Sequence, residues 1–287
     1  MGFDTLVRRE PLGVVGGIVP WNYPVLLSIL KIGPALVSGC TLVLKPSPGT
    51  VLDSYIVAEA AQEAGIPAGV INWVPGDREV GAHLVSHPGI NKVAFTGSTA
   101  AGRKIAEVCG RLLRPVTLEL GGKSAAIILE DAEIAPLLEG MGFASFGNNG
   151  QTCAASTRIL VPASRYDEIV DAVAGMAKSL KVGSSLDPET QIGPMASEAH
   201  RNVVERYIAK GKTEARLVAG GGRPKNAGNG WFVEPTVFAD VDNNATISQE
   251  EIFGPVLSII KYQDEDDAVR IANDSDFGLG GTVLSLG

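Results

Sequence analysis

The chain has 287 residues, enough for one large domain or two ordinary ones. Apolar residues make up 45% and charged residues 20%, which excludes a disordered tail, a collagen-like rod and a coiled coil. A formal net charge of −8 argues against nucleic-acid binding and against a membrane-surface role. Three cysteines and three histidines, without metal-ligand spacing, exclude a disulfide framework and a conventional zinc site.

The N-terminus carries no secretion or lipidation signal, because residues 1–6 lack a basic region followed by an apolar one. One uncharged run, residues 11–30, is long enough to be considered as a membrane span. Its prolines and glycines would break a spanning helix, so we interpret it as a buried strand, a turn and the start of a helix. These features predict a cytoplasmic protein with reduced cysteines and no membrane partner.

In the first half, short segments rich in Val, Ile and Thr alternate with longer amphipathic ones, which predicts a parallel sheet with helices on both faces. Ligands of such sheets bind at the carboxyl ends of the strands. Ser98 and Thr99 are good caps for the fourth helix. The predicted strands span residues 13–20, 41–46, 70–75, 92–96 and 116–120, and the predicted helices 25–37, 51–64, 79–85 and 100–111.

A second α/β unit is predicted from about residue 122. Its strands are expected at 124–129, 157–161, 232–238, 256–262 and 279–285, and its helices at 165–180, 199–209 and 265–273. Both ends of the sequence are abrupt and strand-like, as in a piece of a longer chain. The predicted organisation is therefore an arm at 1–11, a Rossmann-like dinucleotide-binding domain at 12–121 and a catalytic domain at 122–287, both with mainly parallel sheets.

Cys153 lies in an uncharged, polar and glycine-containing stretch, residues 141–157, between a predicted helix and a strand. Such a loop is a poor place for a packing cysteine and a suitable one for an accessible thiolate. Cys40 and Cys109 lie in apolar contexts and are expected to be inert. A cysteine-protease interpretation has little support, because none of the histidines is placed as a base.

Three further polar residues each have two interpretations. Glu119 interrupts a run that otherwise reads as buried strand, so it is either ion-paired or a carboxylate of raised pKa suited to a general base. Asn22 follows a strand end as a turn residue or a fixed amide donor. Lys45 ends a strand as a solvated charge or a ligand clamp.

Phosphate-binding fingerprints are missing from the sequence. The segment before Lys123 lacks the first glycine of a P-loop, and no G-x-G-x-x-G follows a predicted strand. The turn of Gly97 and Ser98 before a helix offers free backbone N–H groups that would favour a phosphate. That signal alone is weak, because such turns are common.

Together these motifs resemble the aldehyde dehydrogenase superfamily in order and spacing. The matching segments are PWNYP at 20–24, KPSP at 45–48, FTGST at 95–99, LELGGK at 118–123, GQTC at 150–153 and EEIFGP at 250–255. The resemblance runs along essentially the whole chain but covers only the middle part of the family's usual length.

The resemblance implies a role for each matching residue. Cys153 corresponds to the nucleophile that forms a thiohemiacetal and then a thioester, Glu119 to the base that activates water, and Lys31 to a lysine near the proton path of that base. The Asn22 amide and the Cys153 backbone N–H would hold the oxyanion. The expected cofactor contacts are Val19, Trp21, Lys45, Ser47, Gly97, Ser98, Leu120, Gly121, Glu251 and Phe253.

The expected cofactor is NAD, with NADP as an open alternative, because Pro48 stands where NAD-preferring members often carry a glutamate. The uncharged residues Tyr23, Thr152 and Ala154 favour an uncharged aldehyde. A CoA-acylating relative and an inactive fragment that only binds dinucleotide are the alternatives, and Glu119 favours hydrolysis over transfer to CoA. A homodimer or homotetramer is expected, joined through an arm that includes residues 5–9.

Overall fold

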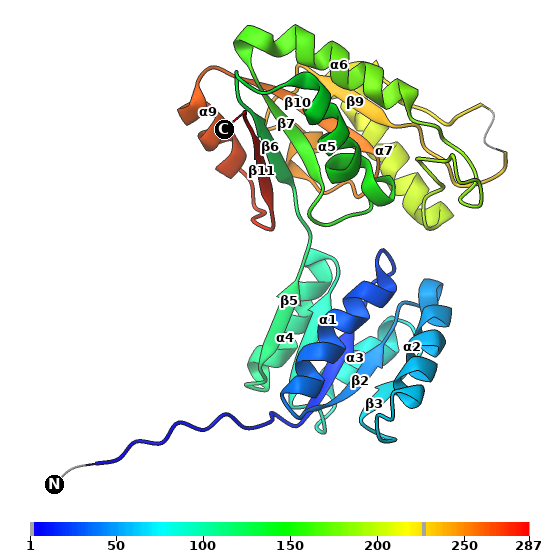
Figure 1. Ribbon diagram of the computed structural model, residues 1–287, viewed down its shortest axis with the longest axis vertical. Coiled ribbons are helices and arrows are strands. Elements are labelled where there is room, and N and C mark those ends of the chain that lie inside the picture. The colour runs from blue at the N-terminus through cyan, green and yellow to red at the C-terminus, as the bar shows by residue number, and fades with distance from the viewer. Residues whose placement is uncertain (1–2, 226–227, 287) are drawn as a thin grey trace. The chain divides into compact units, whose positions relative to one another are not determined.

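The computed structural model describes residues 3–225 and 228–286. The chain divides into two compact units, Met1–Leu120 and Gly121–Gly287, which we call unit 1 and unit 2 (Figure 1). No helix in the described ranges combines the length and the apolar character that a membrane crossing requires.

Unit 1 is built on a parallel sheet with the strand order β3-β2-β1-β4-β5. The central strand β1 brings Ile18, near its carboxyl end, level with Lys45 of β2 and Phe95 of β4. This register places the ends of these strands side by side, where a parallel sheet binds its ligands. The strands span Val14–Ile18 (β1), Thr41–Lys45 (β2), Ile71–Trp73 (β3), Lys92–Thr96 (β4) and Val116–Glu119 (β5).

Helices cover both faces of this sheet (Figure 1). Apolar residues of α1 and α2 pack on one face, and those of α3 and α4 on the other. Pro24 opens α1, while Asp77 and Ser98 cap α3 and α4 by accepting hydrogen bonds from free backbone N–H groups. The helices span Pro24–Val37 (α1), Val51–Glu63 (α2), Arg78–Ser86 (α3) and Thr99–Arg111 (α4), and a short 3-10 turn, Pro48–Thr50, precedes α2.

Unit 2 contains a larger sheet with the order β11-β6-β7-β10-β9-β8. Its strand pairs are parallel except that β8 runs antiparallel to β9. Strands β7 and β10 are buried along almost their whole length, as expected of central strands with helices on both faces. The strands span Ser124–Ile128 (β6), Ser156–Pro162 (β7), Arg216–Ala219 (β8), Thr236–Ala239 (β9), Val256–Tyr262 (β10) and Gly281–Leu284 (β11).

Apolar side chains of α5 and α6 pack on one face of the unit 2 sheet, and those of α7, α8 and α9 on the other. The fully buried Arg158 ties three distant segments together, because its guanidinium donates to the carbonyls of Lys123, Ile271 and Ala272. The helices span Ile134–Phe146 (α5), Tyr166–Ser179 (α6), Glu198–Glu214 (α7), Thr246–Gln249 (α8) and Glu265–Asn273 (α9), and 3-10 turns span Gly147–Gly150 and Ala163–Arg165.

The predicted fold class, α/β with mainly parallel sheets, is confirmed, and most predicted elements lie where the sequence placed them. The strand predicted at 232–238 is wrong in its first half, since β9 begins at Thr236. Phe232 and Val233 are buried without strand pairing, and Pro235 has no N–H to continue a ladder. Strand β8 and the short helix α8 were not predicted.

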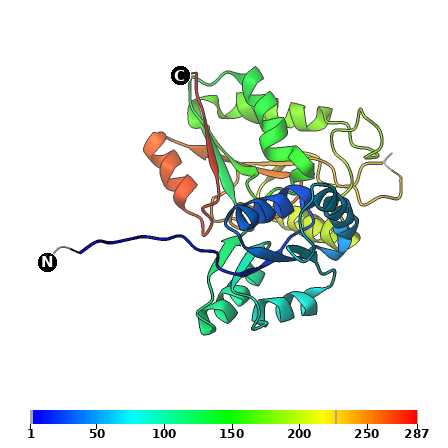
Figure 2. The ribbon, with the colours of Figure 1, turned by 60° about the horizontal axis from the view of Figure 1, so that its bottom comes forward.

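The strand-like interpretation of the N-terminal segment is wrong as well. Residues 3–13 have no regular secondary structure and are mostly exposed (Figures 1 and 2). An extended segment becomes a strand only when another strand satisfies its N–H and C=O groups, and the described part of the chain offers this segment no such pairing.

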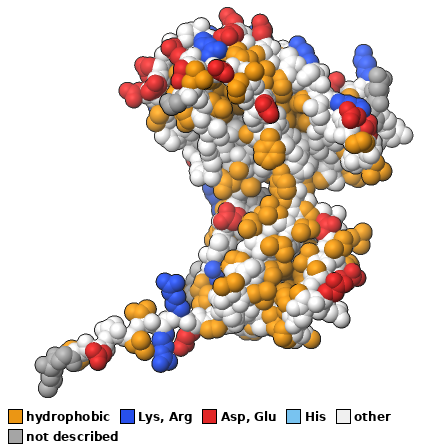
Figure 3. All heavy atoms as spheres, in the orientation of Figure 1, with side chains coloured by type: hydrophobic (Ala, Val, Ile, Leu, Met, Phe, Trp, Pro, Cys, Tyr) orange, Lys and Arg blue, Asp and Glu red, His pale blue; other side chains and the backbone are white. Residues whose placement is uncertain are grey.

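The outer faces of α1 and α2 are apolar, and Figure 3 shows hydrophobic side chains gathered over these helices. Monomeric soluble proteins seldom expose large contiguous apolar patches, so this face has the character of a packing surface. Its exposed apolar residues are Val25, Leu26, Ile29, Leu30 and Val37 of α1, and Leu52, Tyr55 and Ile56 of α2.

Candidate active site

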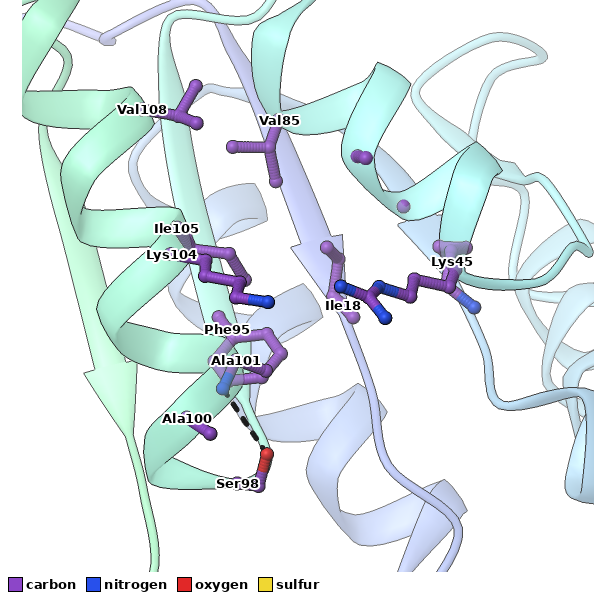
Figure 4. Close-up of a pocket in the computed structure, with 13 residues that line it drawn as sticks. Ile18, Lys45, Val85, Phe95, Ser98, Ala100, Ala101, Lys104, Ile105 and Val108 are labelled. Carbon is purple, nitrogen blue, oxygen red and sulfur yellow. Dashed lines mark hydrogen bonds between the residues drawn. The ribbon is translucent and has the colours of Figure 1, made fainter.

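Unit 1 holds a groove of about 480 Å³ between α3 and α4, over the carboxyl ends of β1, β2 and β4 (Figure 4). Figure 4 shows Val85 of α3 and Val108 of α4 facing each other across it, with Ile105 farther along α4 and Phe95 of β4 beside it. These apolar walls suit a flat, apolar ring, because such surface gains most from being removed from water.

Ser98 lies at the end of this groove where α4 begins. Its hydroxyl oxygen accepts a hydrogen bond from the Ala101 N–H at 3.3 Å, and the residue is exposed. The backbone N–H of neighbouring Gly97 donates to the Glu119 carbonyl at 3.0 Å. The start of α4 therefore combines the positive end of a helix with an exposed hydroxyl, which is favourable for a phosphate.

Lys45 also lines the groove, and its interpretation as a solvated charge is wrong. The residue is 6% exposed, and its ammonium group donates to the carbonyls of Pro46 and Gly76 at 2.9 and 2.7 Å. Burial lowers the pKa of Lys45, and the nearby Asp77 carboxylate opposes that shift. The amino group is thus held at the strand end by backbone oxygens. Ser47, two residues on, is half-buried.

The remaining predicted cofactor residues of unit 1 do not line the groove directly. Val19 is buried with the α1 face of the core, and its N–H donates to the Lys45 carbonyl at 3.1 Å. Trp21 and Asn22 lie half-buried in the turn between β1 and α1. Leu120, also half-buried, packs against α4 so closely that a Cβ at Gly102 would overlap its side chain.

Lys31 and Glu119 lie in unit 1 but apart from the groove. The Lys31 ammonium group donates to the Thr96 hydroxyl at 2.6 Å, and burial lowers the pKa of Lys31 to about 8, with Glu119 opposing the shift. The expectation that Glu119 is buried is wrong. It is exposed, because β5 is an edge strand whose residues alternate between half-buried and exposed positions.

In unit 2, Cys153 follows a turn of unusual backbone geometry. Asn148, Asn149 and Gly150 have φ angles of 52°, 60° and 71° in succession. Asparagine and glycine tolerate this left-handed region better than other residues, which explains their presence here. A side chain at Gly150 would also overlap the Gly254 carbonyl, so the turn lies directly against the segment that precedes β10.

Two side chains of this turn anchor it to a distant loop. The Asn149 side chain accepts from the Gly193 N–H at 2.8 Å and donates to the Pro194 carbonyl at 3.0 Å. The buried Gln151 accepts from the Ala196 N–H at 3.0 Å. The half-buried Cys153 thus follows a turn whose conformation is held at several points. Such support restricts the positions that its thiol can occupy.

The diglycine of the LELGGK motif lies between Cys153 and Glu251. A Cβ at Gly122 would overlap the Cys153 carbonyl, and a Cβ at Gly121 would overlap the Glu251 carboxylate. The Gly122 N–H donates to Glu251 Oε1 at 3.1 Å. Burial raises the pKa of Glu251, opposed by this hydrogen bond and by the charge of Lys123. The predicted residues Cys153, Gly121 and Glu251 are therefore brought together.

Lys123 itself is 2% exposed. Burial and the charge of Arg158 lower the pKa of Lys123 to about 7, while Glu251 and Glu250 act in the opposite direction. The Glu251 carboxylate is therefore close to a second titratable group that changes charge near neutral pH.

Phe253 has a φ of +58°, which is strained for a residue other than glycine. Its carbonyl accepts a hydrogen bond from His200 Nε2 at 2.6 Å, and the two rings meet edge to face at 5.9 Å between centroids. Burial lowers the pKa of His200, with the Phe253 carbonyl opposing the shift. His200 on α7 thus holds the backbone at Phe253, a function that its place on a polar helix had not suggested.

The model of the aldehyde dehydrogenase family matches residues 1–286. The chain belongs to the aldehyde dehydrogenase family. The resemblance drawn from the six sequence motifs is confirmed over essentially the whole chain.

Named relatives fall within the same family. Geranial dehydrogenase from Castellaniella defragrans is 67% identical over 99% of this chain, and a betaine aldehyde dehydrogenase from Rhizobium leguminosarum is 45% identical over 97% of it. A Mycobacterium tuberculosis aldehyde dehydrogenase, solved in complex with NAD⁺, is 55% identical over 97% of this chain with a TM-score of 0.95. The matched region spans 59%, 58% and 58% of these three proteins, respectively.

Most of the residues that support these sites were not predicted from the sequence. Arg78 and Lys104 at the groove, and the anchoring role of Asn149 and Gln151, were not predicted. The groove wall on α4 had a detectable signal, because Ala101, Lys104, Ile105 and Val108 share one helical face. The anchoring side chains of Asn149 and Gln151 had no such signal in the sequence, since their hydrogen-bond partners lie 44 to 45 residues away.

Proposed function

We propose that this chain carries the catalytic parts of an NAD(P)-dependent oxidation of an aldehyde to a carboxylic acid. The observation that carries the proposal is Cys153, the half-buried cysteine that follows an anchored turn and whose backbone lies against Gly122, which in turn binds the Glu251 carboxylate. Cys40 and Cys109, by contrast, are buried in the core of unit 1.

The groove of unit 1 fits the adenosine end of a dinucleotide. Its apolar walls suit an adenine ring, Lys45 stands at the strand end for the ribose, and Ser98 at the start of α4 suits a phosphate. Glu251 and Phe253 are proposed to hold the nicotinamide ribose. Once bound, the dinucleotide would supply the hydride acceptor. The similar Mycobacterium tuberculosis enzyme, solved with NAD⁺, supports NAD as the first choice, with NADP as the alternative.

The covalent step belongs to Cys153. Its thiolate sulfur bonds to the aldehyde carbon, and the carbonyl electron pair moves to the oxygen to give an oxyanion. The carbon then gives up its hydride, for which a bound dinucleotide would be the acceptor, leaving a thioester on Cys153. Water attacks this thioester, the carbon–sulfur bond breaks, and the carboxylic acid and the free Cys153 thiolate result. The Asn22 side-chain amide and the Cys153 backbone N–H are proposed to hold the oxyanion, and Glu119 to take the proton of the attacking water. The exposure of Glu119 leaves it accessible to water, and Lys31, with its lowered pKa, is a candidate proton partner.

An uncharged aldehyde of the geranial kind is the proposed substrate, because geranial dehydrogenase shares 67% of its residues with this chain over the aligned region. The absence of charge at Tyr23, Thr152 and Ala154 supports this choice over an acidic semialdehyde. A cytoplasmic homodimer or homotetramer is proposed, as the family resemblance implies. The functional division is a dinucleotide-binding part at 12–121 and a catalytic part at 122–287.

The direct test mixes the chain with NAD and geranial and follows NADH absorbance. Cys153→Ala should abolish oxidation and leave NAD binding intact, whereas Cys109→Ala, a matched cysteine variant at a buried position, should still oxidise the aldehyde. Oxidation retained by Cys153→Ala would refute the nucleophile assignment. NAD binding without any turnover by the unmodified chain would favour the alternative of a dinucleotide-binding fragment.

A CoA-dependent activity is distinguished in the same assay. If added CoA becomes acylated, thioester transfer replaces hydrolysis as the final step. Glu119→Gln should then have no effect on the rate of NADH formation. Under the proposed hydrolysis, the same variant should still give a first burst of NADH but a lower steady-state rate.

A further inference from the structure

We infer that a second cavity, in unit 2 between β6, β11 and the loop after α9, binds a small carboxylate with a short apolar chain. The cavity has a volume of about 290 Å³, near the lower limit for sites that take small molecules. Figure 1 shows α9 beside β6 and β11. The proposed oxidation assigns no role to the residues of this cavity, so the inference does not rest on the proposed function.

Two buried cations line the cavity. Lys123 and Arg158 are each 2% exposed, and Arg158 lies level with Ala125 in the register of β6 and β7. Lys123 precedes Ala125 by two positions, so in an extended chain both side chains lie on the same face. Arg158 is held by the backbone carbonyls described above, whereas the Lys123 ammonium group forms no ion pair within residues 3–225 and 228–286.

Carboxylates near the cavity offset the cost of burying these cations only in part. Glu251 and Glu250 raise the pKa of Lys123, yet burial and the charge of Arg158 lower it to about 7. Asp274 acts on Arg158 in the same direction, and burial still lowers the pKa of that guanidinium. None of these carboxylates is among the described residues that line the cavity. A buried charge is stable when it is paired, and an anion inside the cavity would supply that partner.

An unpaired hydroxyl adds a hydrogen-bond donor to the lining. Ser124 is 4% exposed, and its Oγ has no hydrogen-bond partner among the described residues. This Oγ lies 3.2 Å from the position that a Cβ of Gly280 would take, so it faces another residue of the lining. A buried polar group without a partner is unfavourable, and an oxygen of a bound carboxylate would accept its hydrogen bond.

The rest of the lining favours an apolar chain. Ile127 and Phe277 are half-buried, while Leu279 and Val283 are exposed at 38% and 62%. A hydrocarbon chain lying against these side chains would be removed from water while its carboxylate meets the cations. The cavity therefore suits an amphipathic anion better than inorganic phosphate or another wholly polar ion.

The test compares hexanoate with 1-hexanol and hexylammonium, which share the chain and differ in charge. Binding to the whole chain is measured by isothermal titration calorimetry. Hexanoate should bind at least about tenfold more tightly than 1-hexanol, and hexylammonium should not bind. A carboxylate is held best by protonated Lys123, whose pKa is about 7. Hexanoate affinity should thus fall about tenfold between about pH 6 and about pH 8, and 1-hexanol affinity should stay constant.

Variants assign the binding to the cavity. Lys123→Met should reduce hexanoate affinity to that of 1-hexanol and remove its pH dependence, whereas Lys178→Met, at an exposed lysine outside the lining, should change neither. Ser124→Ala breaks no hydrogen bond among the described residues, so it tests the site even if Lys123→Met fails to fold. It should weaken hexanoate binding about fivefold. Ser248→Ala is the matched control, because that hydroxyl is also buried and unpaired but lies outside the lining.

Alkylation of Cys153 with iodoacetamide separates this cavity from the proposed catalytic site, and hexanoate should bind the alkylated chain equally well. Binding lost on alkylation would place the carboxylate at Cys153 and overturn the inference. It is also overturned if hexanoate does not bind, if hexanoate and 1-hexanol bind equally, or if Ser124→Ala and Ser248→Ala have equal effects. Each of these outcomes leaves the proposed aldehyde oxidation standing, because that proposal is tested by NADH formation.

Discussion

The two units build their candidate sites in different ways. In unit 1, the groove is formed by residues at strand ends and on the helices that follow them, so the repeated strand–helix order creates it. In unit 2, the turn before Cys153 is held by residues 44 to 45 positions away, and Gly122 meets Glu251 across 129 positions. The groove of unit 1 thus follows from local topology, whereas the surroundings of Cys153 depend on long-range packing.

Buried polar residues show the same difference. Unit 2 encloses Lys123, Gln151 and Arg158 at 2 to 3% exposure, and Arg158 joins segments of three elements or loops. In unit 1, the buried Lys45 bonds only to carbonyls close to its own strand end and the next loop. The stability of unit 2 should therefore be more sensitive than that of unit 1 to the loss of a single buried polar side chain.

Arg158→Ala should have the largest effect. It leaves the carbonyls of Lys123, Ile271 and Ala272 and the Asn243 side chain without their donor, at about 1–3 kcal/mol for each buried group left unsatisfied. We expect a loss of at least about 3 kcal/mol in the free energy of unfolding. Hydrogen exchange measured segment by segment should show faster opening of β6 and β7 than of β1 and β4. Equal acceleration in all four strands would mean that the units unfold together.

Gly150→Ala should be the next largest change. The new side chain would adopt a φ of +71° and overlap the Gly254 carbonyl, so we expect a loss of about 2 kcal/mol or more. Because Gly150 supports the loop of Cys153, the rate at which iodoacetamide modifies Cys153 should change as well. An unchanged rate would show that the thiol does not depend on this turn.

A pH titration tests the electrostatics of unit 1 at Lys31. Burial lowers the pKa of Lys31 from 10.5 to about 8, so between these values the unfolded chain binds more protons than the folded one. The free energy of unfolding therefore rises with pH in that window. Below pH 8, the free-energy cost of burying the charged Lys31 is fully present. The stability advantage of Lys31→Met should shrink between pH 8 and 10.5 in urea unfolding. A difference that is independent of pH would contradict this assignment.

Gly175→Ala should have the smallest effect and the opposite sign. Gly175 is exposed inside α6, and a Cβ there meets no atom within 4 Å. The substitution should stabilise unit 2 by about 0.5–1 kcal/mol because alanine loses less backbone entropy than glycine. It is the matched control for Gly150→Ala. A destabilisation would indicate that unit 2 is intolerant of glycine replacement in general.

Local sequence patterns predicted helices and strands best where the spacing of apolar residues matched the residues that are buried in the structure. Strand β10 and helix α9 match their predicted ranges, and Ser98 caps α4 as expected. The same patterns misplaced Glu119, because an apolar neighbourhood in sequence does not reveal that a strand lies at the edge of a sheet. They also extended the strand at Thr236 across Pro235, where side-chain burial occurs without strand pairing.

The sequence by itself determined the α/β class, most of the strands and helices in their order, the family and the unusual context of Cys153, because periodicity, caps and motif spacing are local properties. Tertiary structure decided the burial of Lys45, the exposure of Glu119, the place of Arg78 and Lys104 at the groove and the anchors around Cys153. These depend on which segments, far apart along the chain, meet at a strand edge or a turn, and no local pattern encodes such a meeting.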